Sequence, residues 1–156
     1  MKTMESNEKI VDALNQLIQI NNDRIEGYEK ASKETNETDL KLLFERFASK
    51  SNMFKSQLNS EVVKRGGKPN ETTTASGKVF RVWMDLKAAL TGKDRKAILN
   101  SCEYGEDAAQ EVYDDVIKSS IGLPTDIMQI ITSQKSTVRM DHDEIKKMRD
   151  HAAQEK

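Results

Sequence analysis

One carboxylate, Glu106, stands where a helical core calls for an apolar side chain. Residues spaced three or four apart share one face of a helix, and Glu106 stands on such a face, seven residues after Leu99 and seven before Tyr113. A buried carboxylate is costly unless it meets a cation, a metal ion or hydrogen-bond donors. The search for chemistry therefore starts at Glu106 and the other members of its face: Leu99, Cys102, Ala109, Tyr113 and Val116.

Three further side chains could join Glu106 in a metal site. Glu103 lies one helical turn earlier, Glu29 flanks the core face of the first predicted helix, and His142 lies beside the core face of the last one. Carboxylate and imidazole groups together suit zinc, manganese or iron. The sequence thus allows one divalent ion, Fe, Mn or Zn, held by Glu29, Glu103, Glu106 and His142.

The interpretation that we favour is a polar core with no cofactor. In it, Glu106 accepts hydrogen bonds from Tyr28, Asn21 or His142, and these bonds fix the register of the helices. Polar groups on the core face of a helix usually find partners in the protein or in bound water. This hypothesis needs no metal ion.

A di-iron oxidoreductase is the least favoured hypothesis. Di-iron bundles use one Glu from each of two helices and a Glu-x-x-His pair from each of the other two. The chain has two histidines, His142 and His151, and the residues three positions before them are Arg139 and Met148. Because no Glu-x-x-His pair exists, we expect a non-catalytic protein.

The elements that must position these residues are four long helices. Apolar residues recur at helical spacing in four segments, separated by turn residues such as Gly66, Gly67 and Pro69, and Gly122 and Pro124. A shorter helix around Trp83 follows the polar stretch 68–76, and Asp94 is the predicted N-cap of the next helix. The four long helices are expected at 7–34, 38–65, 95–120 and 125–150.

Two short connections and one long connection predict the topology. Each short connection makes an antiparallel helix pair, and residues 66–94 form a crossover between the pairs. We therefore predict an all-α, ferritin-like up-down four-helix bundle, a single domain over residues 1–156 with a frayed tail at 151–156. Trp83 and Phe80 are expected to pack the short helix across the end of this bundle.

The composition suits long solvated helices, since 33% of the residues are charged and only 5% are aromatic. Positive and negative residues are interspersed, with a net charge of -1, so neither nucleic acid nor a membrane surface is an expected partner. Cys102 is the one cysteine and is expected to be a buried apolar residue. The sequence shows no signal region and no membrane-spanning run, which predicts a cytoplasmic protein.

Several motifs resemble an uncharacterised bacterial family of ferritin-like four-helix bundles with a domain of unknown function. The resemblance covers nearly the whole chain and implies the fold and a bacterial cytosolic setting, but little about activity. Phe80 departs from it, because many relatives have a histidine there, which removes one potential ligand. The motifs are residues 22–31 (Asn-Asp-Arg-Ile-Glu-Gly-Tyr-Glu-Lys-Ala), Gly66-Gly67-x-Pro69, Arg81-x-Trp83, Cys102-Glu-x-Gly-Glu-Asp107, Leu123-Pro124 and His142-Asp-x-Ile-x-x-x-Arg-Asp150.

The resemblance also implies a mode of action. Ferritin-like relatives are often dimers, and some are linked to stress responses. Together with the missing Glu-x-x-His pairs, this favours a non-catalytic bundle that acts by association, as a homodimer in a stress-related role. A mononuclear metal-binding protein is the alternative.

Overall fold

Five α-helices make up the computed structural model, which describes residues 2–119 and 122–154. No strand occurs in this part of the chain, so the prediction of an all-helical protein is confirmed. None of its helices is long and apolar enough to cross a membrane. The helices are α1 (Lys2–Glu34), α2 (Thr38–Lys64), α3 (Gly77–Gly92), α4 (Arg95–Lys118) and α5 (Thr125–Gln154).

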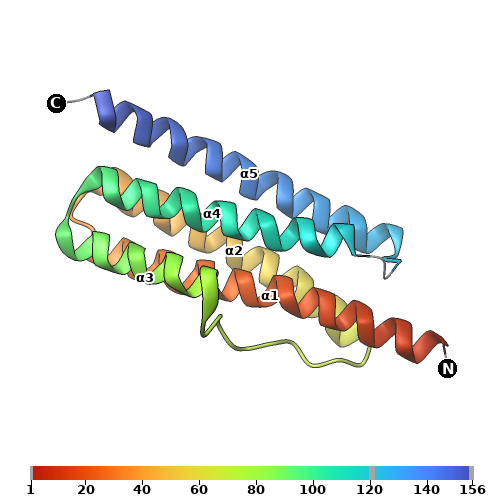
Figure 1. The fold of residues 1–156 in the computed structure, drawn as a ribbon. Helices are drawn as coiled ribbons and strands as arrows, with labels where there is room; N and C mark the ends of the chain where they lie inside the picture. Colours follow the sequence, from red (N-terminus) through yellow and green to blue (C-terminus); the bar gives the residue numbers. More distant parts are fainter. Residues whose placement is uncertain (1, 120–121, 155–156) are drawn as a thin grey trace.

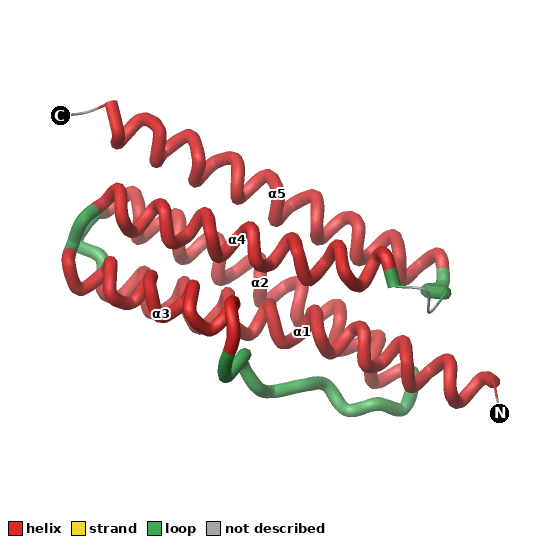
Figure 2. Tube along the Cα trace, viewed as in Figure 1, coloured by secondary structure: helices red, strands yellow, loops and turns green. Residues whose placement is uncertain are grey.

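The four long helices form two antiparallel pairs, α1 with α2 and α4 with α5 (Figure 1). α1 also contacts α4, and α2 also contacts α5, which closes the bundle. Figure 2 shows the link after α2 running back along the outside of α1 before α3 begins. Because the link and α3 return the chain along the bundle, α2 and α4 run in the same direction.

The short helix α3 lies along α1 and α4 rather than across the end of the bundle, so that prediction was wrong. Its Trp83 ring lies between Gly27 on α1 and Gly105 on α4. A Cβ atom at Gly27 would overlap this ring, and one at Gly105 would lie 3.3 Å from it. Two glycines therefore create the space in which α3 docks.

Local signals place the helix ends close to the predictions. Asp94 caps α4 as expected, because its carboxylate accepts hydrogen bonds from the backbone N–H groups of Lys96 and Ala97. α2 ends in a Schellman motif, in which the N–H of Gly67 donates to the carbonyl of Val62 and Gly66 adopts a φ of 76°.

α1 and α5 are longer than predicted. α1 begins at Lys2, and α5 continues through residues 151–154, where fraying was expected. The added segments contain Lys, Glu, Gln and Ala, which favour a helix, and Ala152 of α5 also packs against the apolar core. Residues 155–156 of the predicted tail, and residue 120 at the predicted end of the third long helix, lie outside the described part.

The core consists of two apolar clusters separated by a polar layer. One cluster includes Leu14, Leu58 and Ile131, and the other includes Phe44 and Leu99. The layer between them crosses all four long helices at half their length, and every member is at least nine-tenths buried. Its members are Asn21 and Arg24 on α1, Ser51 on α2, Glu106 on α4, and Gln134 and Asp141 on α5.

Candidate functional site

A charge cluster occupies the centre of the polar layer, with one residue from each long helix. The guanidinium of Arg24 on α1 donates from Nε and Nη2 to the two carboxylate oxygens of Glu106 on α4, at 3.0 and 2.6 Å. Nη2 also donates to Asp141 on α5 at 3.2 Å, and Lys50 Nζ on α2 donates to the other oxygen of Asp141 at 2.9 Å. We call these four residues the central cluster.

The central cluster is neutral as a whole and shielded from water. Arg24 and Glu106 are 0% exposed and Asp141 is 1% exposed, whereas 30% of the Lys50 side chain reaches solvent. Burial disfavours each charge alone, but each carboxylate accepts from a cation, Glu106 in a bidentate arrangement, while Nη1 of Arg24 is buried with no hydrogen-bond partner. The cluster therefore holds the four helices in register.

The protonation states follow from burial and from the pairing. Burial raises the pKa of Glu106, and the adjacent Arg24 guanidinium opposes that rise. Burial also works against the charge of Arg24, yet Glu106, Tyr28 and Asp141 together outweigh it and raise the pKa of Arg24. The charged pair is the form that the geometry supports, because a bidentate contact requires both ions.

Tyr28 and Cys102 lie next to the central cluster and remain neutral. Burial, reinforced by the Glu106 carboxylate, raises the pKa of the Tyr28 hydroxyl and of the Cys102 thiol well above their ordinary values. A thiol of this kind is no nucleophile at neutral pH. Cys102 is buried, which agrees with the expected core role.

A second chain of hydrogen bonds crosses the bundle within the same polar layer. Asn21 Nδ2 donates to the hydroxyl of Tyr113 at 2.9 Å, and that hydroxyl donates to Gln134 Oε1 at 2.7 Å. Gln134 Nε2 then donates to Gln57 Oε1 at 2.9 Å. This path visits α1, α4, α5 and α2 in the same order as the central cluster, so two polar ladders fix the same register.

A third group lies where α4 and α5 approach the surface. We call its members, Glu103, Asp107, His142, Asp143 and Arg149, the edge cluster. His142 Nε2 lies 2.9 Å from Asp107 and 3.3 Å from Glu103, and Nδ1 lies 3.2 Å from Asp143. Glu103 also forms an ion pair with Arg149. The His142 side chain is 16% exposed, so water and ions reach this group.

The four predicted metal ligands do not meet at one point. Glu103 and His142 are adjacent in the edge cluster, Glu106 is engaged by Arg24 in the central cluster, and Glu29 is exposed on the outside of α1. Among the described residues, no three His, Cys, Asp or Glu side chains are grouped so as to hold a metal ion. An ion at Glu106 would have to displace the guanidinium that already satisfies both carboxylate oxygens.

The polar-core hypothesis named different partners for Glu106. It proposed Tyr28, Asn21 or His142 as donors, whereas the two closest donors to Glu106 belong to Arg24. Tyr28 does lie beside this carboxylate, and its hydroxyl helps to lower the pKa of Glu106. Asn21 instead donates to Tyr113, and His142 pairs with carboxylates at the edge.

Arg24 is the member of the central cluster that the sequence argument missed. Arg24 lies three residues after Asn21 and four before Tyr28, so helical spacing alone could have placed it in the core. Its apolar neighbour Ile25 is only half-buried, whereas Arg24 is fully buried.

Comparison with known families finds one match. The model of the family described as "Domain of unknown function (DUF2383)" matches residues 9–119. The matched segment contains Arg24, Lys50 and Glu106 and ends before α5, which supplies Asp141 and His142. A search of curated proteins gave no match.

Proposed function

The chain belongs to the DUF2383 family, defined by a domain of unknown function, and from that premise we propose a ferritin-like bundle that acts by association and not by catalysis. In this proposal the centre of the bundle serves stability and the outer faces serve function. The order of the helices, the central cluster and one face of α2 support it in turn.

The order and direction of the helices support the ferritin-like assignment. Ferritin-like bundles join two antiparallel pairs by a single long crossover. Here the link and α3 together provide such a crossover, and α2 and α4 run the same way as a result (Figure 1).

The observation that carries the non-catalytic proposal is the buried guanidinium of Arg24. Bundles of this class that bind metal direct carboxylates and imidazoles at the ions from four helices. In this chain the same four-helix centre holds a permanent cation, and both carboxylates facing it are already paired. The donor set is complete without a metal ion.

One face of α2 supports association with a second copy. Leu42, Met53 and Val63 are between 61% and 64% exposed. They recur at intervals of 11 and 10 residues, so at about 100° per residue they fall within an arc of about 80° on the helix. Because Met53 is midway between the other two, a two-fold axis at Met53 would place Leu42 of each copy against Val63 of the other.

Light scattering coupled to size exclusion tests the association. We expect a dimer for the unmodified chain and a monomer for Met53→Lys, because a lysine on the axis would face its own copy. The matched control is Tyr104→Lys, since Tyr104 is equally exposed but lies on α4, and it should leave the dimer intact. A concentration-independent monomer of the unmodified chain would refute the association.

Elemental analysis tests the non-catalytic centre. Protein purified without chelator and then incubated with Fe²⁺, Mn²⁺ or Zn²⁺ should hold no ion that depends on Glu106. A stoichiometric ion that is lost in Glu106→Gln would contradict the proposal.

The second candidate function is binding of one divalent ion at the edge cluster. The observation that favours it is the approach of Asp107 and Glu103 to the same imidazole nitrogen, His142 Nε2. Imidazole with two carboxylates is a ligand set for zinc, manganese or iron. Zinc binding that is lost in His142→Gln and retained in Glu106→Gln would support this candidate over the first.

A further inference from the structure

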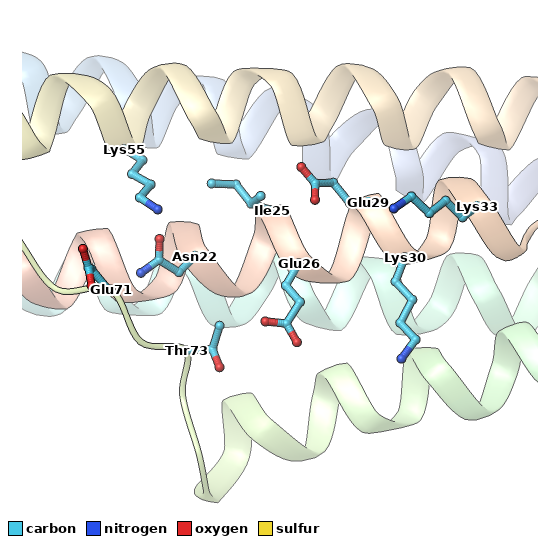
Figure 3. Close-up of a pocket in the computed structure, with 9 residues that line it drawn as sticks. All are labelled: Asn22, Ile25, Glu26, Glu29, Lys30, Lys33, Lys55, Glu71 and Thr73. Atoms are coloured by element: carbon cyan, nitrogen blue, oxygen red, sulfur yellow. The ribbon is translucent and has the colours of Figure 1, made fainter.

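A hollow of about 430 Å³ opens on the outer side of α1, away from both charge clusters. Figure 3 shows that α1 forms its floor, that α2 and the link after α2 contribute to its walls, and that side chains enter it from all three. The volume falls within the range of small-molecule sites. Its lining includes six charged residues: Glu26, Glu29, Lys30, Lys33, Lys55 and Glu71.

Asn22 provides a fixed hydrogen-bond acceptor in this hollow. Its Nδ2 donates to the carbonyls of Asn70 and Thr72 in the link, at 3.1 and 2.9 Å, so the amide cannot rotate without losing both bonds. Its Oδ1 is therefore held in one orientation, and it is buried with no hydrogen-bond partner. Asn22 is 6% exposed, and an unpaired acceptor at such a position favours a bound donor.

The charges around Asn22 are balanced in number and opposite in sign. Figure 3 shows Lys55 extending from α2 toward Asn22, and Lys33 extending toward Glu29. Three lysines and three glutamates line the hollow, so a purely anionic or purely cationic ligand would meet as many like charges as opposite ones. A molecule with one charge of each sign fits this lining.

We propose that this hollow binds a free α-amino acid. The ammonium group of the ligand donates to Asn22 Oδ1 and Glu29, and its carboxylate accepts from Lys55. The half-buried Ile25 supplies the apolar surface beneath the ligand side chain. The proposal is independent of the bundle centre and of the association through α2.

NMR titration of the full chain tests this site. L-alanine, L-glutamine and L-lysine are the probes, each added to about 10 mM, which is tenfold above a Kd of 1 mM. At least one should shift the side-chain amide signal of Asn22 and the backbone signals around Glu29 and Lys55. Acetate and methylammonium each carry only one of the two charges and should cause no such shift.

Glycine betaine tests whether the hydrogen bond from the ligand nitrogen to Asn22 is needed in addition to the two charges. It is a zwitterion, but its nitrogen carries no hydrogen to donate. Betaine should not bind, and binding equal to that of the amino acids would overturn the proposal. Lys55→Met should weaken amino-acid binding about tenfold, the effect of one charge-assisted hydrogen bond. Lys41→Met, an exposed lysine elsewhere on α2, is the matched control and should bind as the unmodified chain does.

Two results would refute the site. One is the absence of any shift with all three amino acids. The other is a set of shifts that avoids the hollow, or that persists unchanged in Lys55→Met. Loss of the dimer in Met53→Lys leaves this titration unaffected, so failure here and failure of the association are separate outcomes.

Discussion

The central and edge clusters are neighbours on α4 and α5, where Glu103 lies one turn before Glu106 and His142 directly follows Asp141, yet they differ in burial. Glu106 and Asp141 belong to the central cluster and are at most 1% exposed. Glu103 and His142 belong to the edge cluster, with side chains 11% and 16% exposed. Similar residue types on neighbouring turns therefore meet very different surroundings.

The difference shows how burial separates a structural ion cluster from a reactive one. In the centre, two carboxylates face two cations, so the charges balance and no further ion is needed. At the edge, Glu103, Asp107 and Asp143 lie within 3.3 Å of the His142 ring nitrogens, and Arg149 pairs with Glu103 and Asp150. The edge cluster has carboxylates close to solvent, and this difference from the centre is the basis of the second candidate function.

The largest expected effect is that of Arg24→Met. It leaves the Glu106 and Asp141 carboxylates facing each other in a dry core, and breaking a buried pair in this way costs about 3–5 kcal/mol. Urea unfolding monitored by circular dichroism measures the loss. The double variant Arg24→Met with Glu106→Gln should recover part of it, because one of the unpaired charges is then absent.

A cost below about 1 kcal/mol for Arg24→Met would contradict the claim that the central cluster is buried away from water and the edge cluster is not. Such a value is typical of exposed ion pairs and would mean that water enters the centre.

The matched pair Glu106→Gln and Glu103→Gln compares the clusters directly. Glu106→Gln removes the carboxylate that binds a buried guanidinium and should cost about 3 kcal/mol. Glu103→Gln makes the same chemical change one turn away in a partly exposed group and should cost about 1 kcal/mol or less. Equal costs from the same urea experiment would show that burial does not distinguish the two sites.

Tyr113→Phe tests the second polar ladder. It removes the hydroxyl that joins Asn21 to Gln134, and leaving two buried amides short of a partner should cost about 1–3 kcal/mol. Thermal unfolding at pH 7 measures this cost, and Tyr104→Phe on the exposed side of α4 serves as the control.

The same tyrosine predicts a change of stability at high pH. Burial raises the pKa of Tyr113 from 10 to about 12 in the folded chain. A raised pKa means that its contribution is complete below pH 10 and is lost as the pH rises through 12. The free energy of unfolding should therefore fall between pH 10 and 12, and less steeply in Tyr113→Phe. Identical slopes in the two proteins would contradict this assignment.

The smallest effect is expected for His142→Gln. Its contacts are partly exposed, so the free energy of unfolding should change by about 1 kcal/mol or less. Calorimetric titration with zinc supplies a sharper measurement than stability, because any binding at the edge cluster requires the imidazole. Zinc binding that survives His142→Gln would remove the edge cluster as a metal site.

Much of the secondary structure was predictable because it depends on local signals. The spacing of apolar residues located five helices, and Asp94, Gly66 and Gly67 marked helix ends through hydrogen bonds that span only a few residues. Glu106 was also identified from its own helix as a carboxylate that must be satisfied inside the core. These features need no knowledge of the neighbouring helix.

Only the tertiary structure decided which partners satisfy those groups. Arg24 and Glu106 are 82 residues apart, and Arg24 and Asp141 are 117 apart, so no pattern along one helix could pair them. The rotation of each helix about its axis brought Arg24 into the core in place of Ile25, and it left Glu29 outside. That rotation is set by the packing of all four helices at once, together with Trp83 seated between Gly27 and Gly105. A single sequence determines the faces of its helices approximately, whereas contacts between helices determine which long polar side chains meet.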